Sequence, residues 1–379
     1  MMRYIKKCGL FTILLLFMLC FLTISASAEE NFNAELYQRQ YESSGAAELS
    51  AALPNSTTKI LDNMGIDISN PTELFNPKTE NILSALRDFL TEGIKEPLQT
   101  ALAVIGVLLI FASFDGIAVK ATSGNMMIFV CFVSSLIATK PVFAVMEVVK
   151  TAIQTLSGFM FSFVPVYTSV MLSSGNTAAA GGFSTLLLGA SEVISYLISY
   201  FFVPVSGAVM CLGICGGVSP VVGISRLSEW IKKTANWAMG IATTLFLGIL
   251  SLQNTFATAA DGIGIRTSKV MLSTAIPIMG PAIAESINTA RGCLGLLRSG
   301  VGIYAVLAIV IIALPVIIQL VLWRISMWVT SGVAEMLGMK QVEGLLRSVD
   351  FCISVLLAAV CFTTLLFIIS LTVCTGVGN

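Results

Sequence analysis

Four polar side chains lie within apolar stretches of this chain and could line a path for an ion or a solute across a membrane. They are two carboxylates and two amides, namely Glu192, Glu285, Asn176 and Asn288. A charged group inside hydrocarbon is costly, so it normally faces a bundle interior or a water-filled cavity. Two other interpretations stay open: the groups reach the membrane surface, or they form hydrogen bonds between helices.

Other kinds of site chemistry are excluded by the residues that the sequence lacks. Histidine is absent from the whole chain, which rules out Ser-His-Asp and Cys-His catalysis, histidine metal ligands and histidine proton relays. No Walker A pattern, glycine-rich dinucleotide turn or HExxH motif is present. Cys211 and Cys215 have no histidine or carboxylate nearby to complete a zinc site. We therefore expect no enzymatic activity, no cofactor and no metal.

Prolines interrupt the apolar stretches that would carry the polar path. We interpret four of them as helix-break positions: Pro165, Pro204, Pro277 and Pro315. A broken helix can free backbone groups to bind a substrate. A proline in a membrane helix can also be a plain kink.

The composition predicts that helices in a membrane position these groups. Apolar residues make up 56% of the chain and charged residues only 11%, whereas soluble domains average about 25% charged residues. The 282 residues after Pro97 contain 13 Lys and Arg and 9 Asp and Glu. We predict an all-α, polytopic membrane domain at 98–379 with about six to eight transmembrane helices. The candidate spans are 98–114, 126–144, 151–172, 186–211, 237–252, 270–286, 300–323 and 351–374.

The first 28 residues have the three parts of a secretory signal peptide. Arg3, Lys6 and Lys7 precede an apolar run at 8–24, and Ala26-Ser27-Ala28 is a cleavage site of small residues. The alternative is an uncleaved anchor helix. Both interpretations place residue 29 outside the cytoplasm.

Residues 29–97 are expected to form an exported acidic segment, with 5 basic and 12 acidic residues. We interpret 29–75 as loosely ordered with short helices, and 77–96 as an amphipathic helix that lies on the membrane surface or binds a partner. Nucleic-acid binding needs a basic surface, so this acidic segment argues against it.

The membrane domain contains a candidate internal repeat. Phe163-Val-Pro165 followed by Asn176-Thr-Ala is echoed by Ile276-Pro277 followed by Asn288-Thr-Ala. Two further pairs of short motifs recur at a nearly constant offset, so we predict repeats at 151–252 and 263–370. Repeats of this kind are common in transport folds. Three spans per unit would make the repeats inverted, whereas a re-entrant first segment would make them parallel.

Several stretches resemble one known family, that of stage III sporulation protein AE. They are Ser162–Val170, Phe246–Gln253, Ala259–Lys269 and Thr375–Asn379. The resemblance implies a multi-pass protein of the mother-cell membrane that surrounds the forespore. It implies a part in the mother cell–forespore channel, which late forespore gene expression and spore formation require. The implied partners are the other stage III A-series proteins and, indirectly, the forespore stage II protein Q.

Two hypotheses for the function follow. The first is a non-enzymatic subunit of this secretion-like channel complex. The second is an autonomous secondary transporter or permease in which Glu192 and Glu285 couple a substrate to an ion. The exported segment favours the first hypothesis, because a lone carrier does not need it.

Overall fold

The computed structural model describes residues 34–63, 66, 68–69, 84, 87, 89–115, 123–174, 177–218, 227, scattered positions from 230 to 249, and 280–376. At 34, 115, 123–126, 177–179, 217–218, 280–291 and 373–376 only the backbone is described. The expected signal peptide, half of the expected amphipathic helix 77–96 and the start of the second repeat lie outside these residues.

Every regular element among the described residues is a helix, which confirms the all-α prediction. In chain order they are α2 (Ala34–Ser44), the 3-10 helix η1 (Ala46–Leu49), α3 (Asn55–Asn63), α6 (Lys95–Asp115), α7 (Ser123–Ser173), α8 (Thr177–Leu197), the π-helix η2 (Ile198–Phe202), α9 (Val203–Val218), α11 (Gly280–Met336) and α12 (Lys340–Gly376). Five stretches in this part of the chain are long and apolar enough to cross a membrane: Phe89–Phe114, Met127–Ser173, Ala180–Gly216, Gly292–Met336 and Lys340–Thr372. The exact number of crossings stays a prediction.

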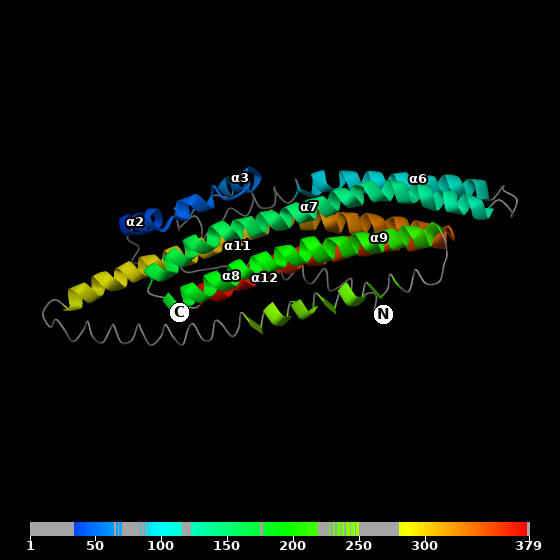
Figure 1. The fold of residues 1–379 in the computed structure, drawn as a ribbon. Helices are drawn as coiled ribbons and strands as arrows, with labels where there is room; N and C mark the ends of the chain where they lie inside the picture. The colour runs from blue at the N-terminus through cyan, green and yellow to red at the C-terminus, as the bar shows by residue number, and fades with distance from the viewer. Residues whose placement is uncertain are drawn as a thin grey trace.

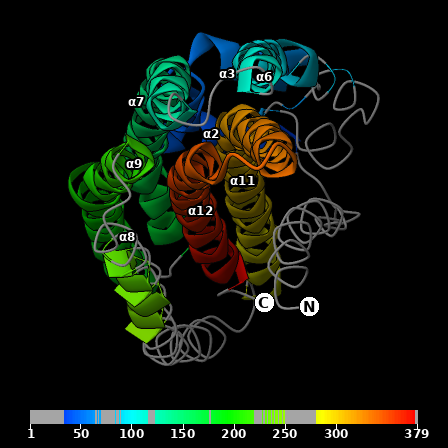
Figure 2. The ribbon, with the colours of Figure 1, turned by 90° about the vertical axis from the view of Figure 1, so that its right-hand side faces the viewer.

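The helices form an elongated bundle with α11 and α12 at its centre. Figure 1 shows the long helices running lengthwise, and the end-on view of Figure 2 shows α6, α7 and α9 arranged in an arc around the central pair. In the most apolar segments of α11 and α12, 67% and 72% of the residues are buried. In the corresponding segments of the outer helices, only 28–39% of the residues are buried. The central pair therefore carries most of the core.

The two expected spans at 126–144 and 151–172 lie on one continuous helix, α7. The link between them, Val145–Lys150, contains no glycine, asparagine or proline to end a helix. Glu147 in this link is exposed, so its charge does not have to enter the core. At about 1.5 Å per residue, the 47 residues of Met127–Ser173 are about 70 Å long, more than twice the ~30 Å thickness of bilayer hydrocarbon.

We use the name cap for α2, η1 and α3, which pack along α7 and α11 (Figure 1). Tyr37 of α2 is fully buried, and its hydroxyl donates a hydrogen bond of 2.7 Å to the carbonyl of Ile68. Leu49 and Leu61 are 1% exposed and belong to the same core as the long helices. The short helices expected in 29–75 are therefore present at 34–63, but they are packed on the bundle and not loosely ordered.

The turn between α11 and α12 is closed by a glycine. Gly338 has φ +76°, a left-handed conformation that glycine adopts at little cost. Its N–H donates to the carbonyl of Glu335, and the N–H of Met339 donates to the carbonyl of Ala334. These two bonds form a Schellman motif, and Met339, the residue after the glycine, is buried. The turn thereby makes α12 run back along α11.

A glycine also sets the close approach between α9 and α12. A Cβ atom added to Gly213 would overlap the Cβ of Ser348 and come within 2.6 Å of its Oγ. We expect Gly213→Ala to destabilise the fold by about 1–3 kcal/mol, since overpacking forces the backbone or side chains to shift. The measurement is the thermal unfolding midpoint of the purified protein in detergent.

Gly189→Ala on α8 is the matched control, because a Cβ there would meet nothing within 4 Å. Adding Ser348→Gly to Gly213→Ala should restore part of the loss. Equal midpoints for the two single alanine variants would show that this contact does not limit the packing of α9 on α12.

Candidate functional site

Among the residues that the structure describes, Arg298 is the only charged residue that is buried, with 5% of its surface exposed. It lies on α11 and points toward α7, where its Nε donates a hydrogen bond of 3.4 Å to the hydroxyl of Tyr167. A buried guanidinium is stable only when hydrogen-bonded groups surround it. This contact therefore fixes α11 against the second half of α7.

Aromatic rings surround the Tyr167 side of this contact. Phe159, Phe163 and Tyr167 are spaced four residues apart and so share one face of α7. Tyr167 stacks on Phe163 at a centroid distance of 5.2 Å and meets Phe183 of α8 edge-on at 5.3 Å. Such pairs add about 0.5–1.5 kcal/mol each beyond the burial of their area. The rings hold the Tyr167 hydroxyl in place for Arg298.

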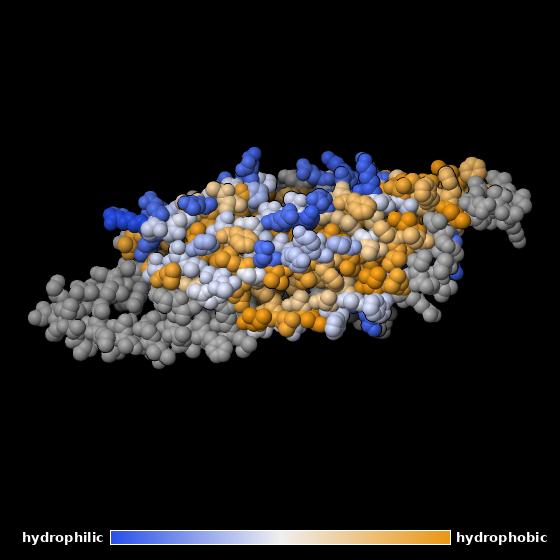
Figure 3. Space-filling model, viewed as in Figure 1, coloured by the Kyte–Doolittle hydropathy of each residue, from blue (hydrophilic) through white to orange (hydrophobic). Residues whose placement is uncertain are grey.

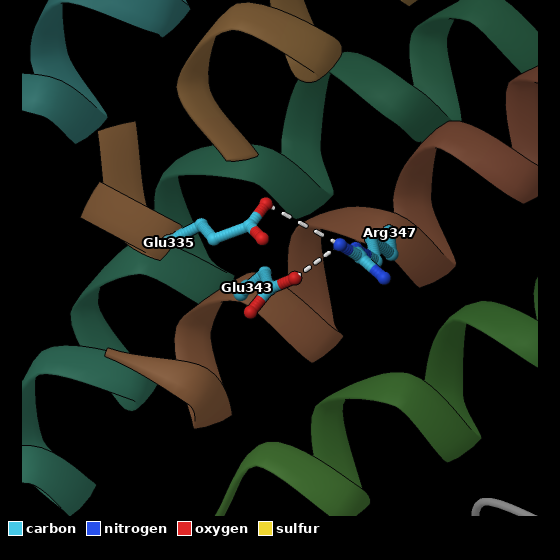
Figure 4. A network of polar contacts seen from close by, with 3 residues as sticks. All are labelled: Glu335, Glu343 and Arg347. Carbon is cyan, nitrogen blue, oxygen red and sulfur yellow. Dashed lines mark hydrogen bonds and ion pairs between the residues drawn. The ribbon is translucent and has the colours of Figure 1, made fainter. Parts of the chain in front are cut away.

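A second group of charges lies at the turn between α11 and α12. Arg347 of α12 forms ion pairs with Glu343 on the same helix and with Glu335 of α11, the latter at 3.5 Å, as Figure 4 shows. Glu335 and Arg347 are about half exposed, so solvent weakens their attraction. Arg324 and Asp350 form a less exposed pair at 3.2 Å. Together these contacts join the end of α11 to the start of α12.

The structure does not bring the expected polar path together within the described residues. Glu192 is exposed on the outer surface of α8. Glu285 and Asn288 lie in the first turns of α11, where only the backbone is described, and Asn176 lies outside the described residues. The path thus stays a prediction.

The expected helix-break positions have different surroundings. α7 continues through Pro165 and α11 continues through Pro315. Pro204 is the second residue of α9 and lies just after the π-helix η2, where the hydrogen-bond pattern of the long helix changes. Pro277 lies outside the described residues.

The contact between Arg298 and Tyr167 was missed by the sequence reasoning. Arg298 lies seven residues beyond Arg291 at the edge of an apolar stretch, where a basic residue is typically taken to reach the membrane surface. The available signal was the periodicity of Phe159, Phe163 and Tyr167, which marks one face of a helix as buried.

Comparison with known proteins gives two matches. Residues 71–378 match the family described as stage III sporulation protein AE. A curated relative with the name stage III sporulation protein AE, from Bacillus subtilis (strain 168), is 26% identical over 228 residues. That match covers 60% of this chain and 57% of the relative, so the alignment spans little more than half the length of the relative. No solved structure matches.

The hydrogen bond from Arg298 can be tested with a conservative change. Tyr167→Phe removes the hydroxyl but keeps the ring contacts, so we expect a loss of about 1.5–3 kcal/mol in stability, the usual range for a hydrogen bond to a charged group. Thermal unfolding in detergent measures it. Tyr196→Phe is the control, since Tyr196 is 64% exposed. If the two variants unfold at the same temperature, the hydroxyl of Tyr167 does not anchor α11.

Proposed function

Because this chain belongs to the stage III sporulation protein AE family, we propose that it is a non-enzymatic membrane component of the channel between the mother cell and the forespore. The family match over residues 71–378 carries this proposal, and it implies a role in sporulation. The channel would be needed for late forespore gene expression and spore formation. The protein would act in the mother-cell membrane around the forespore, with residues 29–97 on the extracytoplasmic side.

Two features of the structure support a subunit of an assembly. The cap packs on the bundle instead of forming a separate domain, so it gives α7 and α11 an additional polar surface on which partners can bind. The proposed partners are the other stage III A-series proteins and, through them, the forespore stage II protein Q. Five helical stretches among the described residues are long and apolar enough to cross a membrane.

The position of Glu192 bears on the alternative of an autonomous transporter. A carrier needs its coupling carboxylate inside the chain, but Glu192 lies on the outer surface of α8. A carboxylate at this position can line a path between neighbouring subunits. This location supports the assembly over the lone permease.

Deletion of the gene in its own organism tests the proposal. We expect engulfment to finish, a late forespore reporter to stay silent and the forespore to shrink, because the channel would be missing. An early forespore reporter serves as the internal control, and the intact gene at another locus should restore spores. Normal spores, with a defect only in uptake or efflux during growth, would reject the channel and favour the transporter.

The polar path is tested by Glu192→Gln in the complemented strain. Removing a negative charge from the wall of a water-filled path lowers the local concentration of cations. We therefore expect fewer heat-resistant spores at an unchanged protein level. Glu92→Gln is the control, since Glu92 is exposed and lies outside both the cap and the polar path. Unchanged spore counts for both Glu192→Gln and Glu285→Gln would show that these carboxylates do not line the path.

A further inference from the structure

Contacts between helices show which residues lie at the same height along the bundle. Ser326 of α11 donates a 2.6 Å hydrogen bond to the carbonyl of Pro97 in the first turn of α6, so these two residues lie at the same height. Toward one end of the bundle from there, Gln341 of α12 lies beside Cys131 of α7. We call this end, with α6, the first half of α7 and the α11–α12 turn, the α6 half.

The opposite end has its own set of contacts. Arg298 and Tyr167 join the start of α11 to the end of α7, and Ser157 of α7 donates a hydrogen bond to the carbonyl of Ser191 in α8. Gly45 of the cap lies close to Val166 of α7. We call this end, with the second half of α7, α8 and the start of α11, the cap half.

Charged residues mark the boundary between the two halves. Lys95 is the first residue of α6. Lys140, Glu147 and Lys150 lie near the middle of α7. Arg324 of α11 and Asp350 of α12 form an ion pair between the two central helices. Such residues are typical of helices at the surface of a bilayer, where long side chains reach the headgroups. α6 has 21 residues and is therefore about 32 Å long, close to the ~30 Å of bilayer hydrocarbon.

The outward faces of the two halves of α7 differ in chemistry. The exposed side chains of the first half include Phe129, Phe132, Leu136 and Phe143, with exposures of 52–67%. Those of the second half are mostly polar or small, namely Thr151, Gln154, Gly158, Ser162, Pro165, Ser169 and Ser173, with Phe161 and Leu172 as the large apolar exceptions at 44% and 49% exposure. α6 continues the apolar face with Leu102, Ile110 and Phe114. Figure 3 shows hydrophobic side chains gathered over this end of the bundle and hydrophilic ones over the cap.

The cap cannot lie in hydrocarbon. Glu35 and Arg39 on α2 form an ion pair whose side chains are 79% and 75% exposed. Two charges in this position would lose their hydration in lipid, which costs several kcal/mol per ion. Since the cap lies against α7 and α11, the side of the cap half that it covers must stand in water.

From these observations we infer that a single bilayer surrounds only the α6 half, and that the cap half stands outside the membrane. The exposed apolar residues of α6 and of the first half of α7 form the lipid-facing surface. The second half of α7 continues beyond the membrane beside the cap. This placement is independent of the channel proposal, because it follows from side-chain chemistry and helix length alone.

Nitroxide labels on α7 test this placement. Phe132→Cys and Ser169→Cys are made separately in the full chain, with the native cysteines replaced by alanine or serine, and each purified protein is labelled and reconstituted into phosphatidylcholine–phosphatidylglycerol liposomes. Electron paramagnetic resonance power saturation then compares collisions with oxygen, which is concentrated in lipid, and with a water-soluble nickel chelate. We expect the Phe132 label to be relaxed mainly by oxygen and the Ser169 label mainly by nickel.

Both positions are exposed on the same helix, so each label is the matched control for the other, and a symmetric peak in size-exclusion chromatography shows that each variant folds. A Ser169 label relaxed by oxygen and not by nickel would place the cap half in the bilayer and overturn the inference. A Phe132 label reached by nickel would place the apolar face in water. A Phe132 label reached by neither reagent would show that a second copy of the chain covers the face instead of lipid. Each of the last two results also overturns the inference.

Discussion

The antiparallel pairing of α11 with α12 is the constraint on which the described structure depends. The turn at Gly338 makes α12 run back along α11, and the two helices bury more of their surface than the others. The long outer helices α6, α7 and α9 each contact one or both of them, and the cap contacts α11. Inside a membrane, packing and hydrogen bonds must supply the association energy, because lipid tails are as apolar as the helices. Close contacts such as that between Gly213 and Ser348 therefore contribute most to helix association inside the membrane.

The sequence predicts the fold class well and the tertiary contacts poorly, for physical reasons. Hydropathy locates apolar stretches because each residue contributes its own transfer free energy to the signal. It does not tell whether the charged link at Val145–Lys150 ends a helix, and the structure shows one continuous α7. The inward position of Arg298 depends on Tyr167, which is 131 residues away in the chain. The burial of Tyr37 likewise depends on neighbours that no local pattern reveals.

The placement of the bilayer changes the meaning of Glu192. An exposed carboxylate facing lipid would be a costly defect and would require a partner group. In the cap half, Glu192 faces water or a neighbouring subunit, so its charge carries no such penalty. A path that passes Glu192 would then run between subunits on the exported side of the membrane. This arrangement suits a channel that continues beyond a single bilayer, whereas a carrier binds its substrate near the membrane midplane.

The charged turn between α11 and α12 lies beside the lipid-facing surface in the α6 half. From Ser326, at the height of Pro97, α11 continues for ten residues to Met336, or about 15 Å. α6 continues for about 27 Å from Pro97 to Asp115, so the turn ends within the thickness of the bilayer. Pairing of Arg347 with Glu335 and Glu343 lowers the cost of these charges without removing it. Water must therefore reach the turn from the side opposite the apolar face. A neighbouring subunit that encloses this water would make the α11–α12 turn part of a channel wall.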